Sequence, residues 1–135
     1  MVDTNIVIYI LKGVEGAVEV ADKLEDDTSE VYFSTIVEAE LFSFHELALE
    51  ERTKIGGILD LGQIISVDSE VALKSAELRA LSRRIHHRKL KLPDAIVAAT
   101  ATLYSAVLVT RNFEDFSHLR NHGLRIWNSF EQLQE

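Results

Sequence analysis

The chain has 135 residues and no cysteine, and 47% of its residues are hydrophobic, which is the composition of an ordinary globular protein. We therefore expect one domain over residues 1–135, in which any metal ion would be held by oxygen or imidazole rather than by thiolate. The net charge of −8 by itself disfavours a nucleic-acid partner. No apolar run approaches the roughly 18 residues of a membrane span, so we expect no membrane contact and a cytoplasmic location.

Short apolar runs with β-branched residues predict strands, and the longer patterns between them predict helices. In chain order, strands are expected near Val2, Val31–Ser34, Ile64–Val67, Ala106–Val109 and Leu124–Ile126. Helices are expected at Asn5–Lys12, Ala17–Glu25, Ile36–Glu50, Glu51–Leu61, Glu70–His87 and Asp94–Tyr104. This alternation indicates an α/β fold with a central parallel sheet and helices on both faces. Ligands of such sheets bind outside the carboxyl ends of the strands.

The first acidic residue at such a strand end is Asp3, which directly follows the short strand at Val2. Aspartate at this position commonly caps the helix that follows. It can equally serve as a ligand at the edge of the sheet, with Asn5 supplying a second polar contact. The sequence leaves both roles open.

Glu40 lies on the apolar face of the helix expected at Ile36–Glu50, while Glu38 falls on the opposite face. Thr35 and Glu38 fit a capping box, in which the two side chains satisfy free amides at the helix start. Glu38 therefore has a structural explanation. Glu40 has none unless it forms a buried ion pair, so we interpret it as a candidate site residue.

A basic run precedes the next candidate acid, Asp94. Five of the fourteen lysines and arginines fall within nine residues, with His86 and His87 between them. The run is either a solvated helix face or, because it leads into a carboxylate site, a surface that binds phosphates. Its members are Arg83, Arg84, Arg88, Lys89 and Lys91.

Asp94 is the only charged residue between Leu92 and Thr110. Together with Pro93, it is good chemistry for starting a helix. The helix that follows is apolar on all sides and should be buried. A carboxylate at the mouth of a buried helix is therefore expected at the edge of a pocket.

The fourth acid, Asp115, is expected in a short polar turn after the strand at Ala106–Val109. Alone it is the weakest candidate, because acids in such turns are usually solvated. Asn112 is placed in the same turn as a neutral ligand or hydrogen-bond partner. Thr110 either orients a carboxylate or simply ends the strand.

These four acids sit at junctions between strands and helices or turns, and three of them lie in or beside apolar stretches, where an unpaired carboxylate is costly. Carboxylates that converge at such a place usually hold a hard divalent cation, which points to metal-dependent phosphate chemistry. No Ser–His–Asp triad is indicated, because all five histidines lie in polar segments that we expect to be exposed. They are His45, His86, His87, His118 and His122.

Four pieces of sequence, in this order, resemble PIN-domain nucleases, and more closely the VapC toxins of bacterial and archaeal toxin–antitoxin pairs: Asp-Thr-Asn near the start, Ser-x-x-x-x-x-Glu-Leu, Leu-Pro-Asp-Ala-x-Val-Ala-Ala-x-Ala and Leu-Val-Thr-Arg-Asn-x-x-Asp-Phe. The resemblance covers the whole chain. It implies an α/β/α sandwich, endoribonuclease activity dependent on Mg²⁺ or Mn²⁺, homodimers and a cognate VapB-like antitoxin. The acidic quartet implied is Asp3, Glu40, Asp94 and Asp115, with Thr110 and Asn112 lining the site.

The resulting hypothesis is metal-assisted hydrolysis of RNA, in which Asp3 and Asp94 hold the main ion and Glu40 and Asp115 complete the site. One alternative is a catalytically inactive interaction module with the same fold. A less favoured one is a metal-dependent phosphatase or phospho-acceptor domain. That class needs Asp-x-Asp at the first strand, or a paired acid there together with a late lysine. Here the first strand is followed by Asp3-Thr4-Asn5, and no lysine follows Lys91.

Overall fold

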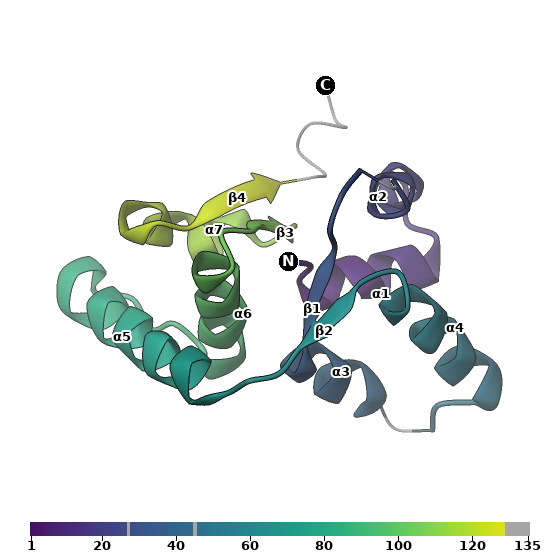
Figure 1. The fold of residues 1–135 in the computed structure, drawn as a ribbon, viewed down its shortest axis with the longest axis horizontal. Helices are drawn as coiled ribbons and strands as arrows, with labels where there is room; N and C mark the ends of the chain where they lie inside the picture. The colour runs from purple at the N-terminus through teal and green to yellow at the C-terminus, as the bar shows by residue number, and fades with distance from the viewer. Residues whose placement is uncertain (27, 45, 129–135) are drawn as a thin grey trace.

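The computed structural model describes residues 1–26, 28–44 and 46–128, and Figure 1 shows its ribbon. The elements are α1 (Thr4–Lys12), α2 (Ala17–Leu24), β1 (Tyr32–Ser34), α3 (Thr35–Phe42), α4 (Leu49–Leu59), β2 (Gln63–Ile65), α5 (Ser69–His86), α6 (Leu92–Leu103), β3 (Val107–Thr110), α7 (Phe113–Phe116), the 3₁₀ helix η1 (Ser117–His122) and β4 (Arg125–Asn128). The predicted strands are present with slightly different ends, except that Val2 forms only an isolated bridge with Val109. The predicted helices are present with similar ends, except the one at Ile36–Glu50.

The strands form two parallel pairs, β1 with β2 and β3 with β4. The first residues of the chain run between these pairs and join them. Val2 donates its amide to the carbonyl of Tyr32 at 3.0 Å, and Asp3 donates to Val109 at 3.1 Å. Val109 in turn donates to the carbonyl of Met1 at 2.8 Å. The predicted α/β fold with parallel strands is confirmed.

Helices cover the strands on two sides (Figure 1): α1, α3 and α4 lie beyond β1 and β2, while α5 and α6 lie on the other side of the molecule. Helix α6 is the most deeply placed of these, with every residue from Ala95 to Ala101 buried. Phe33 of β1 and Leu108 of β3 are fully buried beside it in the same core. The apolar run after Asp94 therefore forms the buried helix that the sequence predicts.

The helix predicted at Ile36–Glu50 is wrong in its second half. Helix α3 ends at Phe42 and α4 begins at Leu49, and between them Glu46 adopts a φ of 62°, which an α-helix cannot contain. Residue 45, a histidine of the predicted segment, lies outside the described residues.

The predicted capping box is also wrong, because the cap of α3 is the preceding residue, Ser34. Its Oγ accepts a hydrogen bond from the amide of Ile36 at 3.2 Å. The hydroxyl of Thr35 instead accepts from the amide of Val67, also at 3.2 Å.

The polar turn predicted after β3 folds into the single turn of α7, followed by η1. Among the described helices, none combines the length and apolarity needed to cross a membrane.

Candidate active site at the carboxyl ends of the strands

Asp3 lies at the centre of the carboxyl edge of the strands, only 5% exposed. Its Oδ1 caps α1 by accepting from the amide of Thr4 at 2.9 Å, and its Oδ2 accepts from the hydroxyl of Thr110 at 2.9 Å. The Thr110 oxygen also accepts from the amide of Asn112 at 3.0 Å. The hydroxyl of Thr110 therefore uses its acceptor capacity for Asn112 and its single proton for Asp3. The two roles that the sequence left open for Asp3 are therefore compatible: it caps α1 and faces the edge.

Glu40 reaches the same edge from α3. Its Oε1 accepts a hydrogen bond from the hydroxyl of Thr4 at 2.7 Å, although the residue as a whole is exposed. Thr4 therefore contacts both acids, through its amide to Asp3 and through its hydroxyl to Glu40. This arrangement holds the two carboxylates on either side of one threonine.

Asp94 lies in the first turn of α6, next to Pro93, and is half-buried. Its pKa is raised from 3.8 to about 6, first by burial and then by the negative charges of Asp3 and Asp115, while the nearby ammonium of Lys91 lowers it. Glu40 raises it as well. Asp94 therefore lies within electrostatic reach of the other three candidate acids.

Asp115 lies on α7 and is exposed, as is usual for an acid in a short surface helix. Together with Arg111 and Asn112 it lines a hollow of about 400 Å³. Its charge raises the pKa of both Asp3 and Asp94, so it contributes to the site through space.

The pKa of Asp3 is also raised, chiefly by burial. Hydrogen bonds from Thr110 and Thr4 lower it, and the charges of Glu40 and Asp115 raise it. Carboxylates in this situation bind either protons or a cation. Their oxygen donors suit Mg²⁺ or Mn²⁺. In the described part of the chain no three acidic or histidine side chains already form a full set of metal ligands, but Mg²⁺ needs only one or two carboxylates because it keeps several waters.

The structure divides the other predicted site residues. Asn5 lines a groove between α1, α3 and α4. Lys91 is the member of the basic run that acts on Asp94. Arg84 is exposed on α5. The remaining three line a second hollow of about 220 Å³ together with Arg79, which the sequence run did not include; they are Arg83, Arg88 and Lys89.

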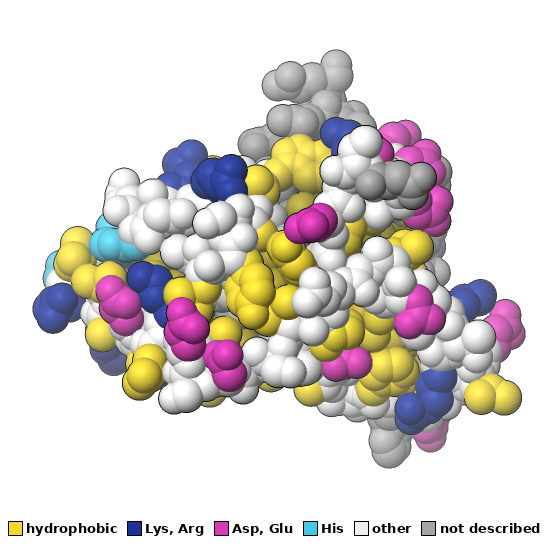
Figure 2. All heavy atoms as spheres, viewed as in Figure 1, with side chains coloured by type: hydrophobic (Ala, Val, Ile, Leu, Met, Phe, Trp, Pro, Cys, Tyr) yellow, Lys and Arg dark blue, Asp and Glu magenta, His cyan; other side chains and the backbone are white. Residues whose placement is uncertain are grey.

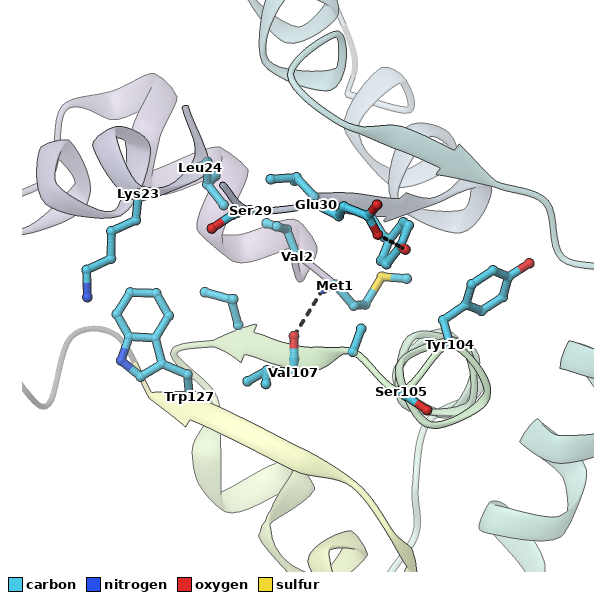
Figure 3. Close-up of a pocket in the computed structure, with 14 residues that line it drawn as sticks. Met1, Val2, Lys23, Leu24, Ser29, Glu30, Tyr104, Ser105, Val107 and Trp127 are labelled. Atoms are coloured by element: carbon cyan, nitrogen blue, oxygen red, sulfur yellow. Dashed lines mark hydrogen bonds between the residues drawn. The ribbon is translucent and has the colours of Figure 1, made fainter. Parts of the chain in front are cut away.

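A different hollow, of about 450 Å³, opens at the amino ends of the strands (Figure 3). There the amino group of Met1 donates to the carbonyl of Val107 at 3.0 Å, and the ammonium of Lys23 lies 4.4 Å from the ring centre of Trp127. Glu30 accepts from the hydroxyl of Tyr32 beside it. This hollow lies at the opposite end of β3 from Thr110 and contains none of the four acids.

The expectation that the histidines are exposed is wrong for three of them. His86, His118 and His122 are half-buried and pack together where α5 meets η1. Only the spacing of His118 and His122, four residues apart, was available as a signal in the sequence, because His86 lies 36 residues before His122.

The fold and this edge define an α/β protein with a cluster of mutually interacting carboxylates at the carboxyl ends of parallel strands. The family model for the PIN domain matches residues 1–121, so the chain belongs to the PIN domain family.

Several solved structures of toxin–antitoxin complexes have the same fold. VapBC2 from Rickettsia felis bound to promoter DNA matches with a TM-score of 0.80 and 24% identity, covering 94% of this chain and 96% of that chain. A toxin–antitoxin complex from Klebsiella pneumoniae is 30% identical over 95% of both chains, with a TM-score of 0.72. DNA-bound VapBC from Salmonella typhimurium is 26% identical over 94% of this chain and 95% of that chain, with a TM-score of 0.75. Among curated proteins, no significant match was found.

Proposed function

We propose that this protein is an endoribonuclease toxin that depends on Mg²⁺ or Mn²⁺ and is neutralised by a cognate antitoxin. The observation that carries the proposal is the pair Asp3 and Asp94, whose pKa values are both raised by burial and by neighbouring carboxylates at one edge of the sheet. Membership of the PIN domain family and the likeness to toxin–antitoxin complexes support it.

In this proposal Asp3 and Asp94 hold the divalent ion, and Glu40 and Asp115 complete the site directly or through water. The bound ion supplies Lewis acidity, which activates water and neutralises charge on the phosphate. The chain itself supplies orientation. Thr110 and Thr4 fix both oxygens of Asp3, and Thr4 also fixes Glu40, so the carboxylates need little reorganisation when the ion and RNA bind.

The RNA backbone would be bound by basic side chains on the α5 side of the site. Lys91 lies close enough to Asp94 to lower the pKa of that carboxyl group. The hollow lined by Arg79, Arg83 and Lys89 is formed by residues that precede Lys91 in the sequence. Such contacts release counterions, so binding should weaken steeply with salt. Because RNA is the substrate, we place the activity in the cytoplasm.

The antitoxin is proposed to occupy the groove between α1, α3 and α4, which measures about 740 Å³. Its walls include Ile8, Leu41 and Phe44, and Phe44 is 51% exposed, so the groove offers apolar surface to a partner. An apolar antitoxin segment fits this groove, and an arginine carried on it would reach the acidic edge beside Asn5. We further propose that the toxin is a homodimer.

The proposal is tested by incubating purified, antitoxin-free protein with single-stranded RNA, tRNA and rRNA in Mg²⁺ or Mn²⁺. We expect cleavage that EDTA abolishes and that Asp94→Asn reduces by several orders of magnitude, whereas Glu38→Gln on the same helix as Glu40 retains it. Metal-independent cleavage, or full activity of Asp94→Asn, would contradict the proposed site. Protein that binds neither metal nor RNA would favour the inactive interaction module.

A further inference from the structure

Three histidines outside the carboxylate site pack together where the end of α5 meets η1. His86 is the last residue of α5, and His118 and His122 lie in η1. The ring centre of His86 is 5.1 Å from that of His118 and 5.2 Å from that of His122, both in edge-to-face contact. Figure 2 shows histidine side chains at this end of the molecule, with basic side chains near them.

Within the cluster, His86 and His122 point their Nε2 atoms at each other, 3.0 Å apart. At this distance one of the two nitrogens carries the proton and the other accepts it, because two protonated nitrogens would repel. The two Nε2 atoms thus converge on one small space. Two imidazoles bound to one Zn²⁺ at about 2.0–2.1 Å lie roughly 3.3 Å apart in tetrahedral geometry, so the pair needs to open by only a few tenths of an ångström.

His118 packs against His86 and is held by a hydrogen bond of its own. The Ser82 hydroxyl donates to the carbonyl of Leu78 at 2.8 Å, so its oxygen accepts from Nε2 of His118, also at 2.8 Å. A neutral ring then leaves Nδ1 as a bare acceptor, and Nδ1 is buried and bonds to no described residue. Burial, followed by the charges of Arg88 and the other histidines, lowers the pKa of His118, which keeps the ring neutral.

The surroundings both favour and oppose a cation. His86 ends α5 and His122 ends η1, so each lies among free carbonyl groups at a helix C-terminus, which attract positive charge. Arg88 opposes it. Since no three histidine or acidic side chains of the described residues already form a full ligand set, the site begins as a two-imidazole pair.

We propose that His86 and His122 bind a transition-metal ion of the Zn²⁺ or Ni²⁺ class through their Nε2 atoms, with water completing the coordination. Imidazole selects such ions over Mg²⁺, so this site is distinct in chemistry and position from the carboxylate edge. On binding, the ring that carried the Nε2 proton returns it to Nδ1 through solvent. The ion fastens η1 to α5.

The test uses untagged, EDTA-treated protein carrying Asp94→Asn, which weakens the carboxylate site, titrated calorimetrically with ZnCl₂ in excess Mg²⁺. We expect one bound Zn²⁺, and an affinity at least tenfold weaker when His86→Gln or His122→Gln is added. The matched control is His87→Asn, because His87 is exposed, has a φ of 53° that asparagine tolerates, and takes no part in the cluster contacts described above. It should bind Zn²⁺ normally.

Thermal unfolding supplies a second measurement that does not depend on activity. Zn²⁺ should raise the Tm of the parent protein and of the His87→Asn variant, but not that of the His122→Gln variant. His122 lies in a surface 3₁₀ helix, so this variant decides the matter even if His86→Gln does not fold. Undiminished Zn²⁺ binding by the folded His122→Gln variant, or no binding by the parent, would overturn the proposal. Neither result depends on whether the protein cleaves RNA.

Discussion

Replacing Asp94 with asparagine should stabilise the metal-free protein at neutral pH, because it removes a carboxylate that the fold holds in an unfavourable place. Burial, followed by the charges of Asp3 and Asp115, raises the pKa of Asp94 from 3.8 to about 6. At about 1.36 kcal/mol per pKa unit, this difference corresponds to at most about 3 kcal/mol. Asp94 is only half-buried, so solvent screening reduces the expected gain to roughly 1–2 kcal/mol.

The gain should depend on pH in a defined direction. The folded wild-type protein binds the Asp94 proton more tightly than the unfolded chain does. The stability that this proton contributes is complete below pH 3.8 and is lost as the pH rises through about 6. The asparagine variant has no such loss. Its advantage in the free energy of unfolding should therefore be smallest near pH 4 and reach its full value at pH 7.

Urea denaturation in EDTA, followed by circular dichroism at several pH values, measures this difference. Asp22→Asn, an exposed change within α2, is the control and should alter stability by less than about 0.5 kcal/mol at any pH. Saturating Mg²⁺ should stabilise the wild type and reverse the order of the two proteins. A variant that is no more stable at pH 7, or equally stabilised at pH 4 and pH 7, would refute the view of Asp94 as a member of a crowded carboxylate site.

Three further predictions follow from individual contacts. Thr110→Val removes the hydroxyl that donates to Asp3, so it should cost about 1–3 kcal/mol in urea denaturation and weaken Mg²⁺ binding; unchanged Mg²⁺ affinity would argue against this role. Gly62→Ala should cost about 1–3 kcal/mol of stability, because a Cβ there would lie 2.6 Å from the Val31 carbonyl oxygen. Gly57→Ala within α4, where a Cβ meets nothing within 4 Å, should instead stabilise the protein by about 0.5–1 kcal/mol. Equal effects of the two substitutions would contradict the packing around Gly62. Arg83→Ala should weaken RNA binding and lower the salt slope by about one, and an unchanged slope would exclude that phosphate contact.

The parts of the fold that could be predicted are those marked by strong local patterns. The uncharged run after Asp94 is long enough to require a buried helix, and α6 is one. Asp3 follows the strand-to-helix junction at Val2, and Glu40 lies on the helix that begins after Ser34. Both are expected at one edge of the sheet because the carboxyl ends of parallel strands lie together. Glu40 was distinguished from Glu38 by helical face, but Glu40 is exposed while Glu38 is half-buried, so the contact of Glu40 with the site is the hydrogen bond from Thr4. The capping box used alongside it was wrong.

The parts that could not be predicted depend on contacts between distant segments. The break between α3 and α4 contains neither proline nor glycine, and apolar residues continue at helical spacing through Phe44 and Leu47, so nothing local marks it. The packing of Leu47 against the core accompanies the break instead. Arg79 is separated in sequence from the basic run but joins its hollow. Likewise, the contact between His86 and His122 exists only after α5 and η1 have packed together.

The most direct test of the proposed site is a calorimetric titration with Mn²⁺ of the EDTA-treated protein and three variants. Wild-type protein and Glu38→Gln should bind Mn²⁺ with the same stoichiometry and affinity, and Asp94→Asn should bind at least tenfold more weakly. The His122→Gln variant should match the wild type, because its imidazole site does not select Mn²⁺. Mn²⁺ binding that survives Asp94→Asn unchanged would contradict the assignment of the acidic edge as the metal site.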